Sequence, residues 1–111
     1  SKAQFQSALI AYESTVNQGV SEAVIALTQL EQGEKRLTAA RAAEAAAEIT
    51  GGGFRASYSA GIASLTDRLR SDQQLLDARL QRITAENAQA KAAIAVYRAF
   101  GGGPPELTEK R

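Results

Sequence analysis

Side chains able to carry chemistry are few in this sequence, and their spacing does not bring them together. The sequence contains neither histidine nor cysteine, which excludes histidine-based triads, histidine metal sites, disulfides and thiolate metal sites. Asp67 and Asp72 are five positions apart, so on a helix they do not share the face that i,i+3 or i,i+4 spacing provides. We therefore expect a protein that is not an enzyme and that binds no cofactor or metal.

Two runs of three glycines are candidates for phosphate binding. Neither Gly51–Gly53 nor Gly101–Gly103 is followed by the Lys-Ser/Thr pair of a phosphate-binding loop, and neither follows a predicted strand. Glycine in a helix interior disfavours the helix, and glycine also caps helix ends. Both runs are therefore predicted to break or cap a helix.

Two long, alanine-rich stretches must position these residues, and both have the seven-residue apolar repeat of a coiled coil. The first helix is predicted over residues 2–50 and the second over 62–100. The predicted core tracks of the first helix are Leu9, Val16, Ala23, Leu30 and Leu37, with Phe5, Tyr12, Gly19, Ala26, Gly33 and Ala40. Those of the second are Ile62, Leu69, Leu76, Ile83, Ala90 and Tyr97, with Gln73, Leu80, Asn87 and Ile94. The sequence thus predicts an all-α fold, a long antiparallel helical hairpin.

The break between the helices is predicted at residues 51–61. Each glycine of the run at 51–53 opposes a helix by about 1 kcal/mol, so we expect the first helix to stop near Thr50 and residues 51–61 to form one mobile loop. Gly61 can adopt the positive φ of a chain reversal. Ser64 and Asp67 resemble a capping box for the second helix.

The predicted C-terminal boundary combines glycine and proline. Gly101 can cap the second helix, and Pro104-Pro105 prevent its continuation. The hairpin therefore occupies residues 1–103, followed by a polar tail over 104–111.

Three tyrosines complete the set of candidate residues. Tyr12 and Tyr97 fall on the core tracks and are predicted to plug the open end of the hairpin. Tyr58 lies at the predicted turn, and two interpretations remain open for it, packing under the loop or contact with a partner.

The net charge of the chain and the width of the apolar stripe on the first helix indicate which kinds of partner it can have. The 111 residues form at most one domain, and 13 basic against 12 acidic residues give a net charge of +1, which provides no electrostatic basis for binding nucleic acid. Val20, Val24 and Leu27 widen the apolar stripe of the first helix beyond a two-helix seam. We expect this helix to touch a second neighbour, and the isolated chain to self-associate as a dimer.

Three segments resemble the outer-membrane factor (TolC-like) family, the channels of efflux pumps and type I secretion systems. They are Tyr58-Ser59-Ala60-Gly61-Ile62-Ala63-Ser64, Leu75-Leu76-Asp77-Ala78 and Val96-Tyr97-Arg98-Ala99-Phe100-Gly101-Gly102-Gly103. The resemblance covers nearly the whole chain and matches the family's C-terminal periplasmic hairpin. It implies a fragment of an α-helical barrel to which three protomers contribute.

The resemblance also implies roles for residues and partners. The hairpin tip that meets the periplasmic adaptor corresponds to Tyr58, Ser59, Ala60, Gly61, Ile62, Ala63 and Ser64, and the constriction lies near Thr66 and Arg70. The inner-membrane pump is then an indirect partner, the channel a homotrimer, and the location the periplasmic portion of an outer-membrane protein.

The chain departs from the family at three points. Arg70 stands where the family often has an acid, so no acidic gate is implied. Gly51–Gly53 stand where the family usually has continuous helix, and Pro104 where it often has tryptophan.

Two alternatives remain open. One is the coiled-coil hairpin of the periplasmic adaptor itself, which lipoyl-like β halves would flank. The other is an enzyme or ligand-binding four-helix protein, which the lack of histidine disfavours.

Overall fold

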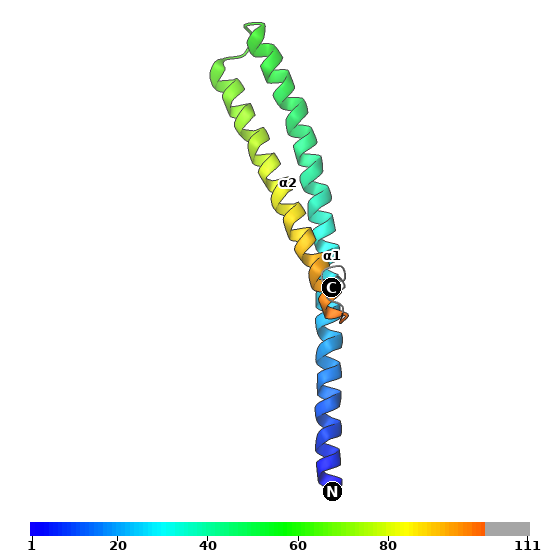
Figure 1. Cartoon of the computed structure of the whole chain (residues 1–111). Coiled ribbons are helices and arrows are strands. Elements are labelled where there is room, and N and C mark those ends of the chain that lie inside the picture. The colour runs from blue at the N-terminus through cyan, green and yellow to red at the C-terminus, as the bar shows by residue number, and fades with distance from the viewer. Residues whose placement is uncertain (102–111) are drawn as a thin grey trace, which may run out of the picture. The chain divides into compact units, whose positions relative to one another are not determined.

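The computed structural model describes residues 1–101, and these residues form two helices joined by a short turn (Figure 1). Helix α1 spans Lys2–Ser59 and helix α2 spans Leu65–Ala99. Residues 1–101 contain no strand, so the predicted all-α helical hairpin is confirmed. The predicted polar tail at 104–111 lies outside the described residues.

Backbone contacts divide the chain into two units. The turn unit comprises Gln32–Ala90, where α1 and α2 run antiparallel on either side of the turn (Figure 1). Among the described residues, the terminal unit comprises Ser1–Glu31 together with residues 91–101. In the part of the chain that is described, neither helix contains a stretch long and apolar enough to cross a membrane.

The turn is a Schellman motif at the end of α1. The Ile62 N–H donates to the Ser57 carbonyl at 2.8 Å and the Gly61 N–H donates to the Tyr58 carbonyl at 3.0 Å, which is the paired pattern of that motif. Gly61 has φ +78°, a conformation that costs an L-residue roughly 1–2 kcal/mol. The predicted reversal at Gly61 is therefore confirmed.

The predicted end of the first helix at Thr50 is wrong, because α1 continues through the glycine run to Ser59. The predicted loop at 51–61 is wrong for the same reason, because residues 51–59 belong to α1 and only Ala60–Ser64 connect the two helices. Gly51 is buried against α2, where Ser71 and Leu75 are its neighbours across the seam. Packing against a second helix of the same chain offsets the weak helix propensity of the glycines.

Helix α2 has the caps that the sequence predicts, with slightly different bounds. It begins at Leu65 and not at Ile62, because Ser64 is its N-cap: the Asp67 N–H donates to the Ser64 hydroxyl at 3.1 Å. It ends at Ala99, one residue before the predicted end, and Gly101 has φ +86°.

The seam of the turn unit consists mainly of small residues. On α1 it follows the predicted tracks and extends them by further steps of three and four. Its members are Gly33, Leu37, Ala40, Glu44, Ala47 and Gly51, all buried or half-buried. Small side chains let two helix backbones approach closely, and a side chain on Gly33 would overlap the Gln89 amide oxygen.

The predicted core of α2 is wrong, because the seam uses a different row of side chains. The buried or half-buried row in the turn unit is Arg68, Ser71, Leu75, Ala78, Arg82, Ala85 and Gln89. The predicted residues Leu69, Leu76, Leu80 and Ile83 are 44–56% exposed. Both rows have the heptad spacing, and in the seam row the small residues Ser71, Ala78 and Ala85 alternate with longer side chains against the glycine and alanine seam of α1.

In the terminal unit, the end of α2 packs beside only part of α1. Ala26 is buried, and Gly19, Ala23 and Leu30 are half-buried, as are Ala92, Ala95, Val96 and Ala99. The earlier core-track residues Phe5, Leu9, Tyr12 and Val16 are 44–67% exposed. The expectation that Tyr12 and Tyr97 plug the open end is wrong, since their exposures are 67% and 42%.

Candidate functional site at the turn and along α2

The residues predicted to form the tip lie together at the turn. Tyr58 and Ser59 end α1, and Ala60–Ser64 connect it to α2. Tyr58 and Ala63 are half-buried, whereas Ser59, Ala60, Gly61, Ile62 and Ser64 are exposed. Ile62 is 82% exposed, so an apolar side chain is presented to solvent on a turn held by backbone hydrogen bonds.

A small polar network supports this turn from below. The Arg68 guanidinium lies 5.3 Å from the centre of the Tyr58 ring, a cation–π distance. Asp72 lies 3.8 Å from Arg68 and 3.5 Å from Arg55, so it links α2 to α1. Of the two interpretations left open for Tyr58, packing beneath the turn is the one that this contact supports.

The residues expected near a constriction are both at the surface. Thr66 and Arg70 lie in the first turns of α2 and are exposed. Their role at a constriction stays a prediction.

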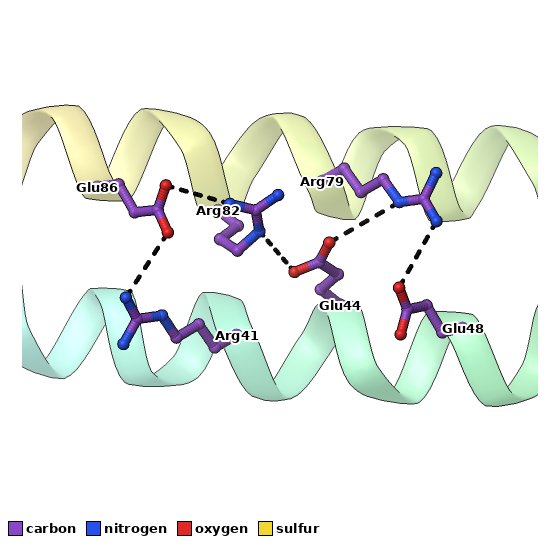
Figure 2. Close-up of polar contacts among 6 residues, drawn as sticks. All are labelled: Arg41, Glu44, Glu48, Arg79, Arg82 and Glu86. Atoms are coloured by element: carbon purple, nitrogen blue, oxygen red, sulfur yellow. Dashed lines mark hydrogen bonds and ion pairs between the residues drawn. The ribbon is translucent and has the colours of Figure 1, made fainter.

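Acidic and basic side chains alternate in a series of ion pairs that crosses the seam in the middle of the turn unit, and we call this series the ionic chain (Figure 2). It contains three residues of α1 and three of α2. In order, the contacts are Arg41–Glu86 at 3.6 Å, Glu86–Arg82 at 3.1 Å, Arg82–Glu44 at 2.6 Å, Glu44–Arg79 at 3.8 Å and Arg79–Glu48 at 3.5 Å.

Arg82 is at the centre of this ionic chain. It donates to Glu44 through Nε and to Glu86 through Nη1, and these two hydrogen bonds raise the pKa of Arg82 above its ordinary value. Glu44 occupies a core position of α1 and its side chain is 16% exposed. The hydrogen bond from Arg82 compensates for the removal of this carboxylate from water.

The sequence analysis missed the pairing of Glu44 with Arg82 across the seam. The signal was present, because a carboxylate at a core position needs a cation nearby and the row of α2 containing Arg82 supplies one. That requirement distinguishes the seam row of α2 from the competing row of larger apolar residues.

Helix α2 carries a second row of side chains that the seam does not use, which we call the outer row. Within the turn unit it comprises Leu69, Gln73, Leu76, Leu80, Ile83, Asn87 and Ala90, all exposed. At 100° per residue, the outer row lies about 150° around the helix from the seam row. Helix α2 is therefore patterned to pack on two nearly opposite faces.

No group of three potential metal-ligating side chains occurs among residues 1–101. The described residues present an exposed turn, an ionic chain across the seam and an exposed apolar row on α2. Comparisons with protein-family models, with curated proteins and with solved structures found no match to this chain.

Proposed function

We propose that the chain is a periplasmic element of the α-helical barrel of a trimeric outer-membrane efflux channel. The channel is a passive export conduit, and the hairpin performs no chemistry. The observation that carries the proposal is the two-sided pattern of α2, with a buried seam row and an exposed outer row. A helix in a closed barrel of helices has a neighbour on each side, so it needs two such rows.

The motifs of the sequence support the same assignment. The Tyr58–Ser64 segment lies at the turn, and the segment from Val96 to Gly101 ends α2 at a glycine of positive φ. In the family that the sequence resembles, these two motifs mark the periplasmic tip and the return of the helix toward the membrane.

The turn is suited to docking a periplasmic adaptor. Its backbone is fixed by the Schellman hydrogen bonds and by the Arg68 and Asp72 contacts beneath it. Its surface combines the apolar Ile62 with exposed small residues, which allow another hairpin turn to approach closely. The inner-membrane pump then connects to this element only through the adaptor.

Site-specific cross-linking in Gram-negative cells tests the proposal. The gene product that carries this segment is produced with a photoreactive residue at Ser59, together with an epitope-tagged periplasmic adaptor. Ser59 is exposed at the turn, and the matched control, Ala45, is exposed on α1 about 21 Å away along the helix. We expect the adaptor to be captured from position 59 and not from position 45.

Equal capture at both positions, or none at either, would contradict docking at the turn. Capture of an outer-membrane channel from position 59 would instead identify the chain as the adaptor hairpin. The coding sequence around the segment gives a second test, since β-strands of a membrane barrel accompany a channel and lipoyl-like halves accompany an adaptor.

A further inference from the structure

We propose that the face of the turn unit that carries the ionic chain lines the inside of the export conduit. The inference rests on the proposed channel role and adds which side chains meet the transported molecules. It is carried by the angle between the two packing faces of each helix and by the order of the charges between those faces.

Both helices of the turn unit have an uncharged face about 150° around the helix from the seam. On α2 this face is the outer row. On α1 the residues at the same angle are exposed, apart from the half-buried Gly52, and they are Thr38, Ala42, Ala45, Ile49, Gly52 and Ala56. Each helix can therefore have one neighbour at the seam and one at its uncharged face, as a helix in a closed barrel must.

The ionic chain lies between these two faces on both helices (Figure 2). At 100° per residue, Glu48 of α1 lies about 70° from the middle of the seam and about 80° from the middle of the uncharged face. Arg79, four residues after the buried Leu75, has the same position on α2. The angle of about 150° is therefore the one measured through the ionic chain, and about 210° remains on the opposite side.

A closed ring requires each helix to hold its two neighbours at less than a straight angle on the inner side. In the turn unit the smaller angle is on the side of the ionic chain for α1 and for α2. A ring built from the seam and the uncharged faces therefore curves toward the ionic chain and encloses it. The opposite surface, which includes Ala46, then faces outward.

The charges at three levels of the hairpin fit this arrangement. The ion pairs Arg55–Asp72, Glu48–Arg79 and Arg41–Glu86, at 3.5, 3.5 and 3.6 Å, show which positions of the two helices are level. At each level α1 and α2 carry opposite signs, so alternating helices in a ring of such hairpins meet opposite charges on the inner side.

These six side chains are between 38% and 61% exposed, so each can also contact the next hairpin. They comprise three cations and three anions. The inner wall at these levels is therefore polar and carries no net charge, which suits the passage of hydrated solutes of either sign.

Cysteine modification of the conducting channel tests the assignment. The gene product that carries this segment is purified as the Glu48→Cys variant and placed in a planar lipid bilayer, and its reversal potential is measured in a KCl gradient. The matched control is Ala46→Cys, because Ala46 is exposed and lies about 160° around α1 from Glu48. The side chain of Glu48 is 54% exposed and Arg79 also contacts Glu44, so the variant should keep its fold.

At position 48, a thiol reagent that adds a sulfonate should shift the reversal potential toward cation selectivity. A reagent that adds a trimethylammonium group should shift it in the opposite direction, because fixed charge on the wall enriches ions of the opposite sign. At position 46 neither reagent should shift the reversal potential, although labelling should be complete at both positions. The parent gene product, treated in the same way, controls for other cysteines.

Two outcomes in a fully labelled, conducting channel would overturn the inference. They are a shift at position 46 that equals or exceeds the shift at position 48, and no shift at either position. A parent gene product that forms no conducting channel would overturn the channel role and the inference with it, so the two failures are distinguishable.

Discussion

Replacing Gly51, Gly52 and Gly53 together by alanine should stabilise the protein. All three glycines lie inside α1, where each costs about 0.5–1 kcal/mol relative to alanine. Added methyl groups have room. At Gly51 the new carbon would lie 3.4 Å from Arg55 Nη1 and 3.5 Å from the Ser71 hydroxyl, and at Gly52 its nearest neighbour would be 4.0 Å away. At Gly53 no side chain of the described part lies within 4 Å.

The expected gain is therefore about 1.5–3 kcal/mol in the free energy of unfolding. For a chain of this size it should raise Tm by roughly 10 °C. Urea unfolding followed by circular dichroism measures the gain, with both proteins at the same concentration because association also shifts stability.

A matched control uses Gly33, the other seam glycine of the turn unit. Alanine there would overlap the Gln89 amide oxygen, so Gly33→Ala should gain less than a residue of the run, or lose stability. Adding Gln89→Ala should restore the gain. If the triple alanine variant is no more stable than the parent, the assignment of the run to ordinary helix is refuted.

Three further predictions concern the turn, the cap and the ionic chain. Gly61→Ala should lower the free energy of unfolding by about 1–2 kcal/mol, because φ at this position is +78°; urea unfolding measures the loss, and an unchanged midpoint would contradict a left-handed turn. Ser64→Ala should cost about 1 kcal/mol through loss of the cap to Asp67, whereas Ser64→Asp should retain stability in the same assay. Hydrogen bonds to Glu44 and Glu86 raise the pKa of Arg82, and a raised pKa in a cation preserves its stabilisation until the pH rises through that pKa. The stability difference between the parent and Arg82→Gln should therefore stay constant from pH 7 to pH 10, and a decline across that interval would contradict it.

The sequence predicted the seam of α1 from Gly19 to Ala40, and it failed on the earlier track residues of α1 and on the seam of α2. Ala23, Leu30 and Leu37 were placed correctly because α1 has only one heptad row that continues into the turn unit. Helix α2 has two rows of equal period, and ranking them by hydrophobicity selected Leu69, Leu76 and Ile83. The row that packs on α1 alternates small residues with longer ones, and its Arg82 supplies the partner of Glu44, which a ranking by hydrophobicity does not take into account.

The C-terminal end of α1 was also predicted wrongly, because helix propensity takes no account of packing against α2. Propensity alone predicts a break at the three glycines near Thr50, but Gly51 lies on the seam and is covered by Ser71 and Leu75. Tertiary packing overrides the local preference there. The turn at Gly61 and the cap at Ser64 were predictable because they depend on local backbone geometry.

The antiparallel seam of the turn unit implies an order of folding. Contacts next to the turn join residues close in sequence, such as Arg55 and Asp72 at a separation of 17, whereas Arg82 and Glu44 are separated by 38. Closing the longer loop first would cost about 0.7 kcal/mol more in chain entropy. After the turn has formed, each further contact needs only a short extension of the helices already paired. The pair should therefore zip from Gly61 toward Gly33, so that substitutions at Gly61 chiefly slow folding and substitutions at Gly33 chiefly accelerate unfolding.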